Sequence, residues 1–410
     1  MKPLLTQLAL LITLQVSATA LSPYSKVSVL TCNPGPEPYA IFGHSAIRVS
    51  DSVSGIDVVF NYGTFDFDDP HFYQKFLGGR LMYFLSASTF GDFLPEYREG
   101  GRIVWEQVLK MTTGEKQAIY DQLLDNLKEQ NKYYKYDFLY DNCSTRIRDK
   151  IQYICADSWI TPPPAGTRSF RQQFSSTYSY NPWTGFGIDV CTGLPADKRP
   201  SATENLFLPQ NLFDALKRAH IVDTTIVYDF TDPKKGEAIN WISPLVVGWS
   251  LFVISVIILA IEIKLKRRFK AFDKVLFTIT GLAGIVMLFL WMLTDHRISR
   301  WNLNLLWASP LNLVTLFSPR FKKPYFSFYS TILALLAVFM LIAPRFLNPA
   351  VFPLALTMLT RTLNRSIQVS SLAWSIEGLN FSGFTGANIL RQREENKARP
   401  ERAERGRRVR

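Results

Sequence analysis

The run "WISPLVVGWSLFVISVIILAI" at residues 241–261 divides the chain into two regions of different composition. It is about as long as a helix must be to cross the hydrocarbon core of a bilayer. Apolar residues are concentrated after Asn240 and at the N-terminus, whereas the region between has the composition of a soluble domain. The run therefore predicts the first span of a C-terminal membrane domain that follows a globular domain.

Four further apolar segments come after the first one. The last three of them are shorter or are interrupted by proline. Together the five segments predict an α-helical membrane domain at residues 241–365. Its spans, about five in number, are expected near 241–261, 275–293, 303–317, 327–343 and 346–360.

The net charge of +12 does not indicate nucleic-acid binding, because the charge lies in the wrong places. Basic clusters at 264–270 ("KLKRRFK") and 320–323 ("RFKK") stand between apolar runs. Basic clusters between apolar runs indicate how a protein is oriented in the membrane far more often than they indicate nucleic-acid binding. With an exported N-terminal domain, the first, third and fifth spans all end at basic segments, which predicts a cytoplasmic C-terminus. The tail at 366–410 is basic and is predicted to be partly disordered.

Residues 1–20 have the features of a secretory signal peptide. One lysine precedes the apolar stretch "LLTQLALLITLQV", and "ATA" at 18–20 provides a cleavage site. The alternative is an uncleaved anchor, but this apolar core is short and interrupted by Thr and Gln. The domain that follows is therefore expected outside the cytoplasm, where disulfides are permitted.

Residues 21–240 are predicted to form this exported domain, with α+β structure. A helix is expected at 112–131, because Thr112 can cap it, Glu115 stands three residues further on, and apolar residues follow at helical spacing. A second helix is expected to begin near Asn142. Short runs rich in β-branched and aromatic residues predict strands at 26–30, 45–50, 55–63, 80–87 and 102–111.

The segment "YDNCSTRIRD" at 140–149 contains a candidate nucleophile. Asn142 is a good helix N-cap, and Cys143 would be the first helical residue. Backbone N–H groups and the helix dipole favour a negative charge there, which lowers the pKa of a thiol and can stabilise an oxyanion. The alternative is that Cys143 is simply a small buried side chain.

A catalytic thiol needs a base, and the chain has only four histidines. His44 follows a glycine at the start of a predicted strand, whereas His71 and His220 stand in polar, surface-like contexts. A lone histidine is more often structural than catalytic, so the Cys143–His44 pairing is a hypothesis at this point. No C-x-x-C or H-x-x-x-H spacing, G-x-S-x-G motif or phosphate-binding glycine loop occurs, so we expect no metal and no cofactor.

Several long motifs follow one another in the exported domain. They are "LTCNPGPEPYAIFGHSAIRV", "VFNYGTFDFDDPHFYQKFLGGRLMYFL", "YKYDFLYDNCSTRIRD", "GIDVCTGLPADK" and "ENLFLPQNL". In this order they resemble the Lnb family, long known as a domain of unknown function. A later motif, "TDHRISRWNLNLLWASPLNL", resembles the membrane region of that family, so the resemblance spans roughly residues 25–360.

The resemblance implies a lipoprotein N-acyltransferase of the bacterial inner membrane. Such an enzyme moves an acyl chain from a phospholipid to the α-amine of a diacylglyceryl-cysteine lipoprotein. The implied fold is a circularly permuted papain-like domain of the NlpC and lecithin:retinol acyltransferase kind, with histidine before cysteine. Cys143 is then the nucleophile and His44 the base. The orienting third residue is Asn61 or Tyr62, since strand alternation lets only one face the site.

Two other classes of function stay open. One is a membrane-tethered cell-wall amidase or endopeptidase of the NlpC type, which a charged cleft would favour. The other is a non-catalytic membrane adaptor that retains an unused Cys–His pair. Five spans favour the acyltransferase, because a peptidoglycan hydrolase has to reach the cell wall and does not need a membrane domain of five spans.

Two further sets of residues carry hypotheses. His296, Arg297 and Asn302 stand at the outer end of the second expected span, where they either contact a phospholipid headgroup or only anchor the chain at the interface. Cys155 and Cys191 look like additions to the family's pattern. They either form a disulfide, which would close a loop of about 36 residues, or are independent substitutions.

Overall fold

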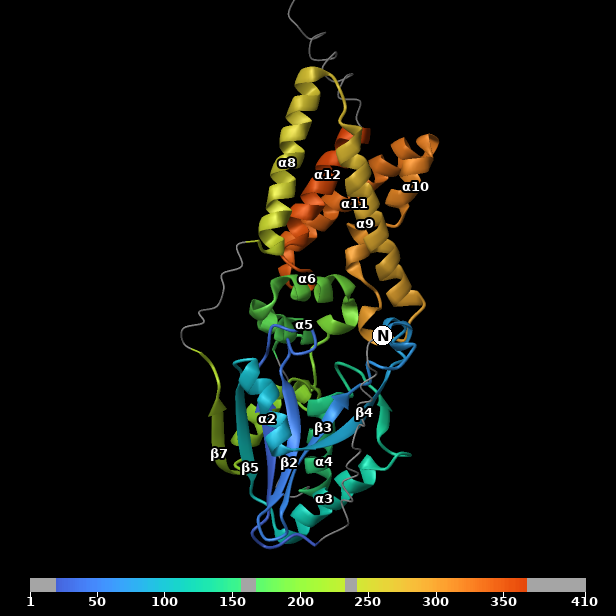
Figure 1. Cartoon of the computed structure of the whole chain (residues 1–410). Helices are drawn as coiled ribbons and strands as arrows, with labels where there is room; N and C mark the ends of the chain where they lie inside the picture. The colour runs from blue at the N-terminus through green and yellow to red at the C-terminus, as the bar shows by residue number, and fades with distance from the viewer. Residues whose placement is uncertain (1–19, 156–166, 233–241, 367–410) are drawn as a thin grey trace, which may run out of the picture.

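The computed structural model describes residues 20–155, 167–232 and 242–366. It has two parts, a sheet with helices on both faces and a group of long helices beyond one end of that sheet (Figure 1). Two short helices, α5 (Phe170–Phe174) and α6 (Pro182–Cys191), lie between the two parts. Most of the expected signal peptide and of the expected C-terminal tail lies outside the described residues.

Seven strands form one sheet in the order β6-β4-β3-β2-β1-β5-β7, and each neighbouring pair is antiparallel. All five expected strands are present, and two more that the sequence does not predict extend the sheet at its edges. The strands are β1 (Lys26–Cys32), β2 (His44–Asp51), β3 (Ile56–Thr64), β4 (Met82–Thr89), β5 (Ile103–Leu109), β6 (Tyr133–Lys135) and β7 (Val222–Asp229).

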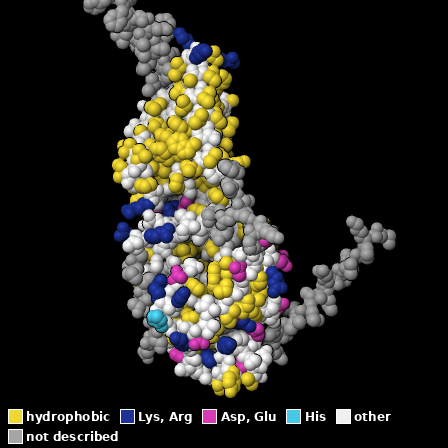
Figure 2. Space-filling view, turned by 90° about the vertical axis from the view of Figure 1, so that its left-hand side faces the viewer, with side chains coloured by type: hydrophobic (Ala, Val, Ile, Leu, Met, Phe, Trp, Pro, Cys, Tyr) yellow, Lys and Arg dark blue, Asp and Glu magenta, His cyan; other side chains and the backbone are white. Residues whose placement is uncertain are grey.

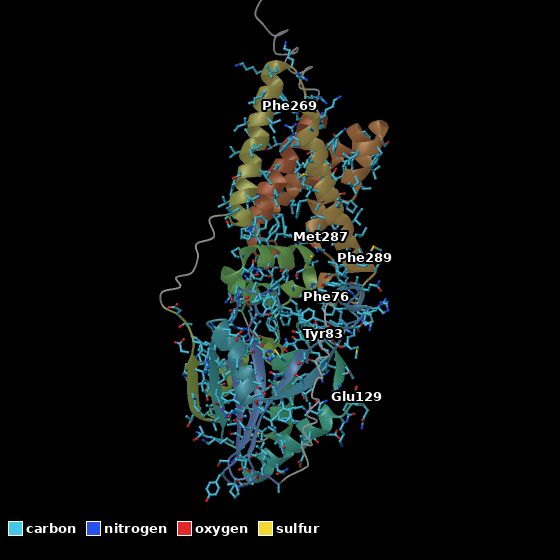
Figure 3. The ribbon with its side chains drawn as sticks, viewed as in Figure 1. Phe76, Tyr83, Glu129, Phe269, Met287 and Phe289 are labelled. Atoms are coloured by element: carbon cyan, nitrogen blue, oxygen red, sulfur yellow. The ribbon has the colours of Figure 1, made fainter. Side chains whose placement is uncertain are left out.

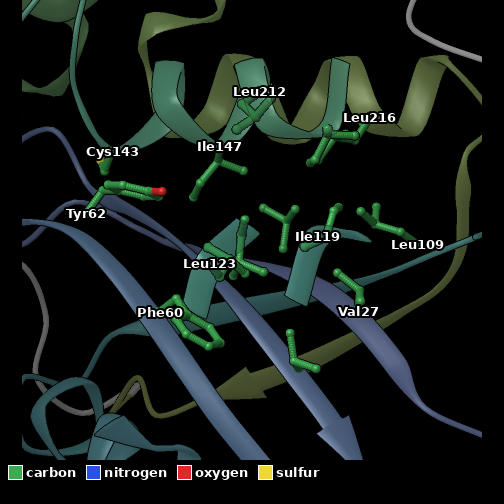
Figure 4. Packing of buried hydrophobic residues seen from close by; sticks show 14 of the residues in the cluster. Val27, Phe60, Tyr62, Leu109, Ile119, Leu123, Cys143, Ile147, Leu212 and Leu216 are labelled. Carbon is green, nitrogen blue, oxygen red and sulfur yellow. The ribbon is translucent and has the colours of Figure 1, made fainter. Parts of the chain in front are cut away.

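Helices cover the two faces of the sheet unequally. α3 (Thr113–Leu127), α4 (Cys143–Ile154) and α7 (Pro209–Arg218) bury their apolar side chains on one face. α2 (Phe90–Glu99) packs on the other, and α1 (Phe72–Leu77) lies between β3 and β4 in the chain. Figure 4 shows the larger core, to which the sheet and the three helices contribute Phe60, Ile119, Leu123, Ile147, Leu212 and Leu216.

The two helices that the sequence predicts begin at their expected caps. Thr112 and Glu115 form a reciprocal capping box at the start of α3. Asn142 caps α4 in the same way with Thr145, so Cys143 is the first helical residue. Each box satisfies backbone N–H groups that a helix start leaves without a partner. The expectations for both helices are confirmed.

Three described helices are long and apolar enough to cross a membrane. They are α8 (Pro244–Leu265), α9 (Lys270–Met292) and the part Pro324–Ile342 of α11 (Pro319–Ile342). In Figure 2 hydrophobic side chains cover this part of the molecule, and basic side chains gather at both ends of the apolar band. Such a band is what the hydrocarbon core requires, with charges held at its edges.

The expected spans near 303–317 and 346–360 are not long continuous helices. The region 303–317 consists of a short 3₁₀ turn and of α10 (Leu311–Phe317), which has seven residues, and α12 (Val351–Ser366) has 16. The count of five spans therefore stays a prediction. The described 3₁₀ turns are η1 (Ser175–Tyr180), η2 (Leu194–Asp197), η3 (Glu204–Phe207), η4 (Arg297–Ser299), η5 (Leu303–Leu306) and η6 (Pro344–Phe346).

The broken segment is packed closely against α9. A Cβ added at Gly284 would lie 2.0 Å from the carbonyl oxygen of Ala308, so only glycine fits this contact. Nearby, Asn312 donates to Thr280 Oγ1 (3.0 Å) and accepts from the hydroxyl of Tyr325 (2.8 Å). Irregular backbone at membrane depth is tolerated where protein buries it and satisfies its polar groups. The break follows from Pro310, which stands just before α10.

A buried ionic cluster joins the far ends of three helices. Arg361 on α12 is fully buried, and its guanidinium donates to Asp273 on α9 (2.6 Å) and to Glu262 on α8 (2.9 Å). Asn364 donates to the same Glu262 (2.6 Å), and Arg365 pairs with Asp273. Buried charges must be paired, so this cluster specifies how the three helices meet.

Replacing Gly284 by alanine should lower the stability of the membrane part. The added methyl group would meet the Ala308 carbonyl, and overpacking of this kind costs about 1–3 kcal/mol. Thermal unfolding of the purified protein in detergent measures the effect. Gly114→Ala, in α3, is the control, because a Cβ there meets nothing within 4 Å. Equal melting temperatures for the two variants would contradict the close contact.

Candidate active site

His44 and Asn61 lie next to each other on neighbouring strands. His44 begins β2, and its Nε2 lies 3.2 Å from Oδ1 of Asn61 on β3. Gly43 precedes His44 with a φ of 76°, and a Cβ there would come within 2.5 Å of the Cys32 carbonyl oxygen. This glycine therefore lets the chain turn sharply into β2 and brings His44 to the end of the sheet.

Cys143 is placed by the start of α4. The Asn142 side chain accepts from the backbone N–H of Thr145 and donates to the carbonyls of Phe138 (2.7 Å) and Phe207 (2.9 Å). The next residue, Ser144, has its Oγ 3.1 Å from that of Ser45 on β2. The helix start is thus attached to the strand that carries His44. Cys143 itself is 8% exposed.

The electrostatics of the pair favour a thiolate. Burial opposes ionisation of Cys143, but the charge of His44 and a hydrogen bond with it, assisted by the Ser45 backbone, outweigh burial and lower the pKa of the thiol. Burial likewise opposes the charged form of His44, yet Cys143 and the hydrogen bond to Asn61 raise the pKa of the imidazole. Each group therefore stabilises the charged form of the other.

Of the two candidates for the third residue, Asn61 is the one that hydrogen-bonds His44. Tyr62 is the next residue on β3, so its side chain points to the opposite face, where it is 1% exposed. Its hydroxyl donates to Asn126 Oδ1 on α3 at 2.6 Å. Tyr62 packs beside Cys143 in the larger core, as Figure 4 shows. Its role there is packing, and its hydroxyl is already engaged.

A pocket of about 320 Å³ opens beside His44 on the α2 side of the sheet. His44 and Asn61 form part of its wall, and Asp92 and Glu96 of α2 also line it. Among the described residues no group of three or more His, Cys, Asp or Glu side chains is placed to hold a metal ion. A thiol beside an imidazole can attack an acyl carbon as the thiolate while the imidazole transfers the proton.

The site lies at the end of the sheet nearer the helical part. β7 runs toward α8, and β5, β1 and β2 follow it in alternating directions, so His44 stands at the same end as Asp229. The N-terminus of α4 lies at this end too, since Ser144 contacts Ser45. Both proposed reacting groups therefore face the region where the two parts of the molecule meet.

Asp189 on α6 is the centre of the contact between the two parts. It is 4% exposed and pairs with Arg171 (3.3 Å), while its other oxygen accepts from Asn348 (2.9 Å). Its backbone carbonyl accepts from Asn304 (3.1 Å). The contact depends on partners that are distant in the sequence; its one local signal is a single aspartate between Ile188 and Val190, which indicates a buried charge that needs a partner.

The three residues at the outer end of α9 have different surroundings. His296 Nε2 lies 3.0 Å from the Phe76 carbonyl oxygen, and Arg297 is exposed. Both help to line a pocket of about 180 Å³ between the two parts. Asn302 is 3% exposed, donates to the Val190 carbonyl (2.7 Å) and accepts from the Asn304 backbone (2.9 Å). The expectation that Asn302 contacts a headgroup is therefore wrong, because its polar atoms hold α6.

The expected disulfide between Cys155 and Cys191 is not formed. Both are free thiols that belong to different regions. Cys155 packs in the larger core at the end of α4, where burial raises the pKa of its thiol to about 11. Cys191 ends α6, which packs against α8 and α9. The alternative that the two are independent substitutions describes them better.

Comparison with protein families identifies both parts of the molecule. The fold and the site define a membrane protein whose sheet domain carries a Cys–His pair. The model of the Lnb N-terminal periplasmic domain matches residues 15–168, and that of the Lnb transmembrane domain matches residues 236–371. The chain belongs to the Lnb family and is an inner-membrane protein with a periplasmic N-terminal domain. No curated protein and no solved structure matches it.

The electrostatics predict the pH dependence of alkylation. Labelling of Cys143 by iodoacetamide should begin below the ordinary pKa of a thiol, because His44 stabilises the thiolate. His44→Ala leaves burial unopposed by that charge, so the inflection should move to higher pH. Peptide mass spectrometry at a series of pH values measures it. Cys32, whose thiol pKa burial raises to about 12, is the internal control and stays unlabelled. Identical profiles would contradict the pairing.

Asp189→Ala should destabilise the docked arrangement. Arg171 would keep Asp197 (2.9 Å) but lose its second carboxylate partner, and loss of a partner from a buried pair costs about 3 kcal/mol. Thermal unfolding in detergent measures the loss, with Asp223→Ala, an exposed aspartate on β7, as the control. An unchanged melting temperature for Asp189→Ala would show that the two parts are joined in another way.

Proposed function

We propose that this protein is a lipoprotein N-acyltransferase. It transfers an acyl chain from a phospholipid, through a thioester on Cys143, to the α-amine of a diacylglyceryl-cysteine lipoprotein. The observation that carries the proposal is the Cys143–His44–Asn61 arrangement at the end of the sheet that faces the membrane helices. Both substrates are membrane lipids, so a site held at the membrane surface meets them by lateral diffusion.

The first half-reaction forms the acyl-enzyme. The Cys143 thiolate attacks the carbonyl carbon of the phospholipid ester, and backbone N–H groups at the start of α4 hold the oxyanion. The imidazolium of His44 then donates its proton to the departing alkoxide, which leaves as a lysophospholipid. A thioester and a neutral imidazole remain. The lowered pKa of the Cys143 thiol supports this step, because it increases the share of the nucleophilic thiolate.

The second half-reaction forms the amide. The lipoprotein amine attacks the thioester carbonyl, and neutral His44 takes a proton from it as the C–S bond breaks. Asn61 keeps the imidazole oriented through its hydrogen bond to Nε2. Asp92 and Glu96 make one side of the adjoining pocket acidic, which suits an acceptor that approaches as an ammonium group. The cycle restores the thiolate–imidazolium pair.

We propose the permuted papain-like fold on related grounds. A helix that begins with the nucleophile packs on an antiparallel sheet, and the histidine stands on a strand earlier in the chain. In the same proposal the exported domain ends near residue 240, the membrane domain spans 241–365, and the C-terminus is cytoplasmic. Ser366, the last described residue, lies at the end of the helices away from the sheet, which supports that orientation (Figure 1). His296 and Arg297 stay candidates for contact with the donor headgroup.

One observation favours a second function. The pocket beside His44 is partly polar, with Asp92, Glu96 and Arg102 among its lining residues, and a charged cleft suits a cell-wall peptide. An amidase or endopeptidase of the NlpC type would use the same pair with water as the second nucleophile. Release of soluble fragments from peptidoglycan by the purified protein would establish this function in place of the acyltransferase.

Cys143→Ala should abolish acyl transfer without unfolding the protein. With phospholipid and no acceptor, the wild type should accumulate an acyl group on Cys143 that hydroxylamine releases, because a thioester is labile to it. His44→Ala should lose nearly as much activity, since nucleophile and base act as a unit. Mass spectrometry of the protein and of lipoprotein N-termini measures both. Cys191→Ala is the control, and an acyl group that maps elsewhere would contradict the mechanism.

A further inference from the structure

A group of aromatic side chains surrounds α1 and the loop before it. Phe72 stacks on Phe76 with ring centroids 5.9 Å apart. It also contacts Phe67 (4.9 Å), Phe65 (5.8 Å) and Tyr73 (5.3 Å). Phe72 is buried, but most of its neighbours are not. Tyr73 is 77% exposed, Phe67 65%, and Phe76 47%. Contiguous exposed apolar residues of this kind mark an interaction surface.

The position of α1 indicates what this surface meets. The Gly78 carbonyl accepts from the backbone of Asp295 (2.9 Å), and Lys135 pairs with the Asp295 side chain (2.7 Å). These contacts attach the end of α1, and β6, to the segment that follows α9. The segment lies at the end of α9 nearer the sheet. There Met292 and Leu293 are each 68% exposed. The exposed side chains of α1 therefore lie close to the exposed apolar end of α9.

The same aromatic group leads inward to the site. Phe65 contacts Tyr83 (5.4 Å), and Tyr83 stacks on Tyr136 (4.5 Å). Phe65 also lines the pocket that contains His44 and Asn61. In Figure 3 Phe289 of α9, Phe76 and Tyr83 follow one another from the helices toward the sheet. Apolar side chains therefore connect the edge of the membrane part with the Cys–His pair.

We propose that the segment 65–77 inserts its exposed apolar side chains into the outer leaflet and forms the route by which a lipid acyl chain reaches Cys143. The leaflet contact stands by itself, whereas the route rests on the proposed acyltransferase function. The occupant of this surface is a lipid leaflet, because the surface lies close to the exposed apolar end of a membrane-spanning helix. Lys75, Arg80 and Lys135 lie near it and pair with Asp69 and Asp295, so the apolar side chains are bordered by charged groups, as at the edge of a bilayer.

Photocrosslinking tests the leaflet contact directly. Benzoylphenylalanine replaces Tyr73 in the full chain, which is placed in vesicles of phosphatidylethanolamine and phosphatidylglycerol and irradiated. Tyr24 is the matched control, because it is the same residue type and is also 77% exposed, but it precedes β1 at the opposite end of the sheet. We expect phospholipid adducts at position 73 and none at 24. Adducts to a second copy of the chain or to another protein, or no lipid adduct at 73, would overturn the proposal.

A kinetic comparison tests the route. Tyr73→Glu and Leu77→Glu change only exposed side chains, and Tyr24→Glu is again the control. Acylation of Cys143 is measured with a long-chain phospholipid in vesicles and with a short-chain phospholipid dissolved as monomers. We expect about a tenfold loss for the vesicle donor, because leaflet binding scales with buried apolar area, and no loss for the monomeric donor.

The outcomes separate the two proposals. Equal loss with both donors, or no loss with either, would overturn the route while leaving the acyltransferase proposal in place. If neither donor acylates Cys143 in the wild type, the acyltransferase proposal fails, and with it the route. The crosslinking result would then still decide whether α1 contacts the leaflet.

Discussion

The buried pair of Arg171 and Asp189 is the constraint on which the arrangement of this molecule depends. Two charges removed from water must be paired and hydrogen-bonded, and here the remaining acceptors of Asp189 are satisfied by Asn304 and Asn348 of the membrane part. The hydrogen bonds of Asp189 are therefore complete only when the sheet domain and the helices are docked. Its carboxylate accepts from three residues, Arg171, Tyr178 and Asn348, which leaves it little freedom to move. The position of the site relative to the membrane helices follows from that docking.

The Cys–His pair depends on geometry of a more local kind. Gly43 turns the chain into β2, β3 supplies Asn61, and the capping box at Asn142 begins the helix at Cys143. None of these groups reaches the others through its own segment alone, since they come from three elements that meet at one end of the sheet. Burial by itself disfavours both charges, and each group offsets this effect for the other by lowering the pKa of the thiol and raising that of the imidazole. A substitution of either residue should therefore change the pKa of the other.

Features with a local chemical signal could be predicted from the sequence, and features that depend on distant partners could not. The caps at Thr112 and Asn142 and the long apolar run at 241–261 each carry their own signal. Strand alternation predicts that only one of Asn61 and Tyr62 faces the site. The register of the sheet was needed to show that Asn61 is the one beside His44. The break at Pro310 shows in the sequence as a proline, yet its accommodation depends on Gly284 of another helix. The predicted disulfide between Cys155 and Cys191 is wrong, because the sequence does not show that the two residues lie in different regions of the fold.

A thiolate and an imidazole can serve a hydrolase or a transferase, and the difference lies in which nucleophile reaches the acyl-enzyme. Water is present at about 55 M in bulk, so transfer requires that the thioester be reached more easily by the amine than by solvent. Cys143 is 8% exposed, and the aromatic side chains from Phe65 to Tyr136 lie on the side toward the membrane. Asp92 and Glu96 line the pocket that also contains His44 and Phe65. In the proposed enzyme the acyl chain would lie along the aromatic side chains and exclude water, while the ammonium group would approach past the two carboxylates. The same carboxylates would suit the peptide substrate of a hydrolase, so the apolar approach from the membrane is the feature that separates the two functions.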